Sequence, residues 1–240
     1  SYAVHFCLQC HYWALTNLPK KVFSMKKNII VAASGIFFVG LFVLATTLYN
    51  KQQDGELNRA SMDNIDNVQR EHSAIMGPLD AKVTIVEFFD PACGTCSAFY
   101  PFVKKLMDDN PGKVNLVLRY LPLHQNSDVI VSILEASRLQ DRFAETLSMA
   151  YQSRDRWIEH HVAKPQKFWQ QLAGLDLDMK KLNEDLQSPE IARRIKLDMQ
   201  DAQALNVNKT PGFFVNGKRL TQFGYQQLQD LVESEIAASY

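Results

Sequence analysis

The feature that most constrains this chain is an uncharged, mostly apolar run of 21 residues, Ile29–Tyr49. At a rise of 1.5 Å per residue, a helix of that length spans the roughly 30 Å hydrocarbon core of a bilayer. Lys26 and Lys27 precede the run, and Asp54 soon follows it. Because positively charged flanks stay in the cytoplasm, we expect the N-terminus inside and the bulk of the chain outside.

The apolar run is expected to lie between an N-terminal extension and a polar linker. Residues 25–50 are expected to be an uncleaved signal anchor, with a cleaved signal peptide or a buried helix of a soluble protein as alternatives. Met25 followed by lysines is typical of the start of an exported protein. Residues 1–24 are therefore interpreted as a non-native or cytoplasmic extension. The polar residues 51–72 are expected to form a juxtamembrane linker, with a short helix around 57–70.

The charge distribution gives no reason to expect nucleic acid as a partner. The chain has 26 basic and 26 acidic residues, but every acid follows residue 50. Residues 51–240 therefore hold 22 basic and 26 acidic residues, a net charge of −4. Binding to a nucleic-acid backbone requires a clustered basic surface instead.

The rest of the chain begins with a strand, a helix and a strand. Lys82–Phe89 is β-branched and aromatic, as expected of a central strand that is buried on both faces. Ala98–Asp109 carries apolar residues at helical spacing, and Val114–Leu121 supplies a second buried strand. This order predicts a βαβ unit with a parallel sheet.

The remaining patterns complete an α/β domain over residues 73–240. Residues 126–206 lack a convincing strand and contain several helical stretches, so they are predicted to form a helical insertion. Strand character returns at Gly212–Asn216, and Asn216-Gly217 is typical of a type I′ hairpin turn. A last amphipathic helix is predicted over Tyr225–Ala238.

Two cysteines stand where the first predicted strand gives way to the helix, in the sequence Cys93-Gly94-Thr95-Cys96. Unpaired amide donors and the helix dipole favour an anion at a helix N-terminus. A thiolate there has a lowered pKa, roughly 3.5 to 7.5 in such motifs, and only the thiolate attacks a disulfide. We therefore predict that Cys93 is the nucleophile and that Cys96, one turn further and facing inward, resolves the mixed disulfide.

A cysteine pair of this spacing can also be half of a zinc site. Zinc needs two further ligands, and residues 51–240 offer no other cysteine and only scattered histidines, at 72, 124, 160 and 161. The pair His160-His161 is interpreted as a solvated helix end. A structural disulfide across four residues would stabilise the fold little compared with one that closes a long loop. We expect redox chemistry, with neither a metal nor a cofactor.

Two further positions are candidates for the site. Glu87 lies six residues before Cys93 in an otherwise apolar strand. We predict a buried acid beneath the cysteine pair that exchanges a proton with the resolving thiol; the alternative is a carboxylate that points to solvent. A cis bond at Thr210-Pro211 would expose backbone groups of Thr210 to an incoming client strand. Base rates favour trans, so the residues leave both forms open.

Three separated segments of the sequence occur in the order that is typical of one protein family. They are VTIVEFFDPACGTC at residues 83–96, the strand LVLRYLPL followed by the long helical insertion, and KTPGFFVNGKRL at residues 209–220. Over roughly residues 73–237 the chain resembles the DsbA-type branch of the thioredoxin superfamily. The resemblance implies a thioredoxin-like fold, preceded here by an N-terminal transmembrane helix. It also implies a cis peptide at Pro211, Cys93 as attacking thiol, Cys96 as resolving thiol and Glu87 as buried acid.

The resemblance implies a thiol-disulfide oxidoreductase that acts on exported, cysteine-containing proteins at the periplasmic or extracytoplasmic face of a bacterial membrane. Gly94-Thr95 lacks the histidine that stabilises the thiolate in strongly oxidising relatives, which leaves the direction of electron flow open. An oxidase would be reoxidised by a DsbB-like membrane partner, and a reductase or isomerase would be reduced by a DsbD-like donor. Isomerases of the family usually carry a sizeable N-terminal dimerisation domain, for which residues 51–72 are too short, so an oxidase is favoured.

Client contacts are expected at four residues around the cysteine pair: Gly94, Thr95, Thr210 and Pro211. A function from another class is a chaperone-like module that binds clients without turnover. The intact pair of Cys93 and Cys96 argues against that alternative.

Overall fold

The structure is a computed structural model that describes residues 20–63 and 65–240. The chain divides into two units, Ser1–Asp54 and Gly55–Tyr240. Residues 1–19, which hold most of the expected N-terminal extension, lie outside the described residues, so that interpretation stays a prediction.

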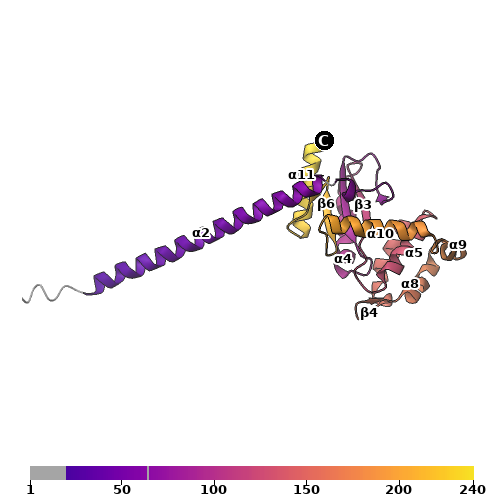
Figure 1. Ribbon diagram of the computed structural model, residues 1–240, viewed down its shortest axis with the longest axis horizontal. Coiled ribbons are helices and arrows are strands. Elements are labelled where there is room, and N and C mark those ends of the chain that lie inside the picture. Colours follow the sequence, from indigo (N-terminus) through magenta and orange to yellow (C-terminus); the bar gives the residue numbers. More distant parts are fainter. Residues whose placement is uncertain (1–19, 64) are drawn as a thin grey trace, which may run out of the picture. The chain divides into compact units, whose positions relative to one another are not determined.

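The first unit contains the beginning of one long helix, α2 (Lys20–Asp63), drawn in indigo and purple in Figure 1. Its stretch Val31–Met62 is long and apolar enough to cross a membrane, and its most apolar window is not buried by the rest of the chain. A helix that is apolar on all sides is typical of a membrane span. The expected linker is more helical than predicted, because α2 continues to Asp63 and α3 (Ile65–Val68) follows.

The second unit is built on a five-stranded sheet with the order β1-β3-β2-β6-β7. Its strands are β1 (Ala74–Met76), β2 (Val83–Phe89), β3 (Val114–Tyr120), β6 (Gly212–Val215) and β7 (Lys218–Arg219), and the closing helix is α11 (Tyr225–Ser239). β2 and β3 are parallel and joined by α4 (Gly94–Asp109), which confirms the predicted βαβ unit. β6 and β7 form the predicted hairpin, with Asn216 and Gly217 at positive φ as a type I′ turn requires.

The connection from β3 to β6 is the insertion predicted for residues 126–206. It contains α5 (Ser127–Arg138), α6 (Phe143–Gln152), α7 (Arg154–Trp157), α8 (Pro165–Gln171), the 3₁₀ turn η1 (Leu172–Gly174), α9 (Met179–Asp185) and α10 (Pro189–Ala204). Figure 1 shows α5, α8 and α9 gathered together, with α10 in orange running from them along the sheet. A short hairpin interrupts the helices, β4 (Ile158–Glu159) with β5 (Val162–Ala163). His160 and His161 form its turn at positive φ, so their interpretation as a helix end is wrong.

The side chains of β2 alternate between two cores. Ile85 and Phe89 join the core that includes α4 and α11, whereas Val86 and Phe88 join a second core beneath α10. The period of two residues along a strand puts Glu87 in phase with Ile85 and Phe89. The carboxyl of Glu87 is therefore directed to the face that α4 covers.

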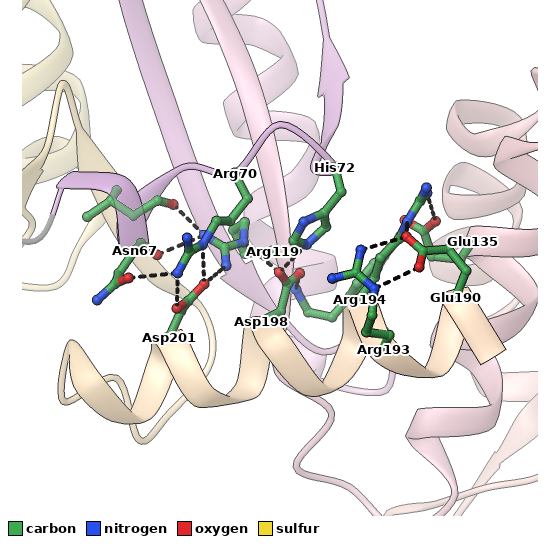
Figure 2. A network of polar contacts seen from close by, with 12 residues as sticks. Asn67, Arg70, His72, Arg119, Glu135, Glu190, Arg193, Arg194, Asp198 and Asp201 are labelled. Atoms are coloured by element: carbon green, nitrogen blue, oxygen red, sulfur yellow. Dashed lines mark hydrogen bonds and ion pairs between the residues drawn. The ribbon is translucent and has the colours of Figure 1, made fainter.

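On the opposite face, a fully buried arginine of β3 links the sheet to α10. Arg119 is 0% exposed, and its Nε and Nη2 donate to Asp198 at 2.9 Å and to Asp201 at 2.5 Å. Its Nη1 donates to the carbonyl oxygens of Asn67 and Val68, at 2.8 and 2.9 Å. Figure 2 shows these contacts.

The network extends to the segment that precedes β1. Arg70 reaches Asp201 at 2.7 Å, and His72 contacts Asp198 at 2.8 Å (Figure 2). Burial opposes ionisation of Asp201, but hydrogen bonds from Arg70 and Arg119 outweigh it and lower the pKa of that carboxyl. The segment after α2 is thus fastened to α10 and to the middle of the sheet, so it belongs to the folded domain rather than to a loose tether.

Replacing Arg119 by Met should destabilise the full chain in detergent by about 3–5 kcal/mol at pH 7, because Asp198 and Asp201 would lose the buried cation between them. The loss should shrink at low pH, as the carboxyl of Asp201 becomes protonated. Urea unfolding followed by tryptophan fluorescence measures it. Arg193→Ala is the control, since its ion pair with Glu190 is exposed. Equal midpoints for the two variants would contradict a structural role for the network.

Candidate active site

Cys93 is the N-cap residue of α4, and the helix proper begins at Gly94. The backbone is held there by a bond from Cys93 N to the Asp90 carbonyl oxygen at 3.0 Å and by one from Ser97 N to the Cys93 carbonyl oxygen at 3.1 Å. Both cysteines are free thiols. Cys93 keeps an exposure of 7%, whereas Cys96 is 0% exposed, so a client could reach the first sulfur and not the second.

The two sulfurs differ in acidity. Hydrogen bonding with Cys96 lowers the pKa of Cys93 to about 5; burial opposes this shift, and contacts with Thr210 and with the backbone amides of Thr95 and Cys96 support it. Burial raises the pKa of Cys96 well above its usual value, and Cys93 and Glu87 add to that effect. The site therefore combines one accessible thiolate with one buried thiol.

Glu87 is the buried acid that the sequence predicts. Its side chain lies beneath the pair, 1% of the residue is exposed, and its Oε1 has no hydrogen-bond partner among the described residues. Burial raises the pKa of Glu87 to about 8; the charge of Cys93 adds to the shift, and a hydrogen bond with Cys96 opposes it. The alternative of a solvent-facing carboxylate is excluded. Near pH 7 this carboxyl is mostly protonated and can give a proton to the sulfur of Cys96.

The peptide bond between Thr210 and Pro211 is cis, as the resemblance implies. The thiol of Cys93 donates to the Thr210 carbonyl oxygen at 3.4 Å, so this loop lies directly against the predicted nucleophile. Pro211 is buried, while Gly94 and Thr95 are exposed at the start of α4. The four residues expected to contact a client thus lie close to Cys93 in sequence or in space.

Asp90 is a site residue that the sequence patterns did not reveal. Its carboxylate is 0% exposed and accepts hydrogen bonds from the amides of Ala92, Leu123 and His124 at 2.8 Å, from His124 Nδ1 at 2.7 Å and from the hydroxyl of Ser127. It thereby ties the loop before Cys93 to the loop after β3 and to the start of α5. An acid at the end of an apolar strand is the one sequence pattern that points to Asp90. The sequence does not show which residues donate hydrogen bonds to its carboxylate.

His72, His124 and His160 do not gather at one site. His72 contacts Asp198 and His124 contacts Asp90, while His160 lies in the β4–β5 turn. Within residues 20–63 and 65–240, no three His, Cys, Asp or Glu side chains gather in a way that would hold a metal ion.

Iodoacetamide should alkylate Cys93 and spare Cys96 in the reduced protein near neutral pH, because the first sulfur is ionised and the second is buried and protonated. The rate should rise with pH through a midpoint near the pKa of Cys93, about 5. Peptide mass spectrometry of the full chain in detergent identifies the labelled residue, and Cys93→Ser should lack the fast reaction. Faster labelling of Cys96 would overturn the assignment.

Glu87→Gln should stabilise the chain increasingly as the pH rises. The pKa of Glu87 is raised from 4.5 to about 8, so between these values the folded state binds a proton that the unfolded state has released, and the wild type loses stability with rising pH. The Gln side chain does not titrate in this range. The free energy of unfolding of the variant minus that of the wild type should therefore be about 3 kcal/mol greater at pH 8 than at pH 5. Urea midpoints at the two pH values measure it. An advantage that does not grow with pH would rule out a buried acid with a raised pKa.

Known proteins share this fold. The family model for thioredoxin matches residues 69–234. A thioredoxin-like oxidoreductase from Silicibacter pomeroyi is 28% identical, with a TM-score of 0.62 over 70% of this chain and 95% of that one. BdbD from Bacillus subtilis in its oxidised form is 22% identical, with a TM-score of 0.61 over 69% and 93% of the two chains. The thiol-disulfide exchange protein α-DsbA2 from Wolbachia pipientis is 18% identical, with a TM-score of 0.65 over 76% and 97%.

The chain is also similar to parts of larger proteins. The Na⁺/H⁺ antiporter NhaA 3 of Salinispora tropica is 31% identical over 202 residues, which cover 81% of this chain and 30% of the antiporter. For NhaA of Herminiimonas arsenicoxydans the identity is 29% over 153 residues, or 64% and 24% of the two proteins. The chain spans less than a third of the length of these curated relatives. Because the thioredoxin model covers more than half of the chain and DsbA-like proteins share its fold, the chain belongs to the thioredoxin family.

Proposed function

We propose that this chain is a protein thiol-disulfide oxidoreductase that exchanges disulfides with exported, cysteine-containing proteins. The observation that carries the proposal is the contrast between its two sulfurs. Cys93 stands at the N-terminus of α4 with a pKa of about 5, and Cys96 is buried one turn further with a raised pKa. This contrast suits one sulfur to exchange with a client and the other to close the internal disulfide.

Disulfide donation starts from the oxidised pair. A client thiolate attacks Sγ of Cys93, the Cys93–Cys96 bond breaks, and the sulfur of Cys96 leaves and takes the proton of Glu87. A second client thiolate then attacks the client sulfur of the mixed disulfide, and Cys93 leaves as a thiolate. The client has gained a disulfide, and two electrons remain on the pair until a partner accepts them.

The acidity of Cys93 favours this direction of electron flow. A thiolate of low pKa is a good leaving group, and its stabilisation favours the reduced form of the pair, which makes the oxidised form a stronger oxidant. We therefore assign the chain as an oxidase that is reoxidised by a DsbB-like membrane partner. A reductase or isomerase fed by a DsbD-like donor is the competing assignment.

Client binding is assigned to the loop against Cys93. The carbonyl oxygen of Thr210 lies 3.4 Å from the nucleophilic sulfur, so an extended client segment that pairs with this backbone would bring its own sulfur close to Cys93. Pairing through the main chain gives affinity without demanding one client sequence. The exposed residues Gly94 and Thr95 lie beside this loop at the start of α4, and buried Pro211 follows Thr210 within it.

The proposed location is the extracytoplasmic face of a bacterial cytoplasmic membrane. The apolar stretch of α2 supports an anchor there, and Lys26 and Lys27 on its N-terminal side support the orientation. The antiporter relatives are named for whole proteins of which this chain spans under a third. Sodium-proton exchange is therefore not part of the proposal.

A Cys96→Ala variant of the full chain, expressed in membranes, should accumulate mixed disulfides between Cys93 and its clients, because the resolving thiol is missing. Non-reducing gels and mass spectrometry detect them, and Cys93→Ala is the matched control that should trap none. Equal client capture by Cys93→Ala would support a chaperone-like module instead. In the wild type, rapid thiol trapping should find the pair mostly oxidised; a mostly reduced pair would support a reductase or isomerase.

A further inference from the structure

Arg154, the first residue of α7, brings a positive charge from the insertion to the backbone beside Cys93. Its Nη2 and Nε donate hydrogen bonds to the carbonyl oxygen of Ala92, at 3.0 and 3.3 Å. Ala92 directly precedes Cys93 in the chain. The guanidinium is therefore fixed to the backbone on one side of the nucleophile.

The same guanidinium lies over the residue on the other side. A Cβ atom placed on Gly94 would be 3.5 Å from Nη2 and 3.6 Å from Cζ of Arg154, which is ordinary van der Waals contact. Because glycine has no side chain, only backbone separates the cation from the first turn of α4. The planar group thus spans both neighbours of Cys93.

The surroundings of α7 hold this arginine in place. Trp157 at the end of the helix is 0% exposed, its Nε1 donates to the Ala150 carbonyl oxygen at 2.9 Å, and its ring packs on Phe168 with centroids 5.2 Å apart. Asp155 lies 4.0 Å from Nη1 of Arg154 with a 100% exposed side chain, whereas the arginine side chain is 23% exposed. An exposed carboxylate at that distance competes weakly for the cation.

A fixed cation at this place affects one redox state of the pair. Adding two electrons and one proton to the Cys93–Cys96 disulfide gives a thiolate at Cys93 and a thiol at Cys96. The disulfide is neutral, so a positive charge beside Cys93 stabilises the reduced pair and leaves the oxidised pair unaffected. The guanidinium is always protonated in proteins and adds to the partial charge of the helix N-terminus.

Building on the disulfide exchange proposed above, we propose that Arg154 is a positioning residue that sets the redox poise of the pair. Held across the backbone on both sides of Cys93, it makes the oxidised pair a stronger disulfide donor. Electron flow in this chain is thus governed partly by a residue of the inserted helices, 62 positions along the sequence from the backbone group that it binds.

The test is the equilibrium of the Cys93–Cys96 pair with glutathione, measured on the full chain in detergent. Arg154→Gln keeps hydrogen-bond donors and loses the charge. It should make the pair less oxidising and shift the equilibrium constant about three- to tenfold, where tenfold corresponds to 29.6 mV for a two-electron couple. It should also raise the pH midpoint of thiolate absorbance. Arg154→Lys keeps the charge and should retain most of the wild-type value.

Salt provides a readout that a merely structural role would not move. The difference between the wild type and Arg154→Gln should shrink at about 1 M salt, which screens a partly exposed charge. Arg156→Ala is the matched control: it lies on the same helix, its guanidinium bonds to Gln171 Oε1 at 3.3 Å, and it should keep the wild-type equilibrium.

A folded Arg154→Gln protein with the wild-type equilibrium would overturn the inference, and so would Arg154→Lys shifting as far as Arg154→Gln. If the glutamine variant fails to fold, the lysine variant and the salt dependence of the wild type still decide. A wild-type potential that does not respond to salt would then count against the inference. Equilibration with glutathione needs no client, so failure of the client-trapping experiment would refute the proposed function without altering this result.

Discussion

The carboxylate of Asp90 holds together the segments from which the active site is built. It is fully buried, and it accepts hydrogen bonds from the loop before Cys93, from the loop after β3 and from the first residue of α5. A buried carboxylate is tolerated when donors satisfy its oxygens, and here the donors come from several places in the chain. The position of the nucleophile relative to the sheet and to the insertion therefore depends on this one group.

Hydrogen bonding and burial give the remaining groups of the site different acidities. Hydrogen bonding with Cys96, supported by Thr210 and by backbone amides, lowers the pKa of Cys93, whereas burial raises the pKa of Cys96 and of Glu87. One helical turn separates the two sulfurs, and the period of strand β2 places the acid beneath the second. Hydrogen bonding to Cys93 and burial of Cys96 and Glu87 thus combine an accessible ionised sulfur with a protonated carboxyl next to the buried sulfur.

Much of this arrangement could be predicted from local patterns. The β2–α4–β3 unit follows from apolar runs and helical spacing, and the burial of Glu87 follows from its place in a strand covered on both faces. The β4–β5 hairpin could not be found in this way, because its strands have two residues each and its turn uses His160 and His161 at positive φ instead of glycine or asparagine. The hydrogen-bond partners of Asp90 could not be predicted for another reason. Ser127 is 37 positions away in the sequence, and only the tertiary fold brings it near Asp90.

The insertion is consequently part of the active site as well as of the fold. Through α10 it binds Arg119 of the central sheet, through α5 it binds Asp90, and through α7 it binds the backbone beside Cys93. The dipeptide Gly94-Thr95 lacks the histidine expected of a strong oxidant, yet its glycine leaves the backbone open to a cation that comes from elsewhere in the chain. If Arg154 acts as proposed, the four residues of the CGTC motif do not by themselves determine the redox poise, because a shift of α7 would change the charge beside Cys93 while leaving the motif intact.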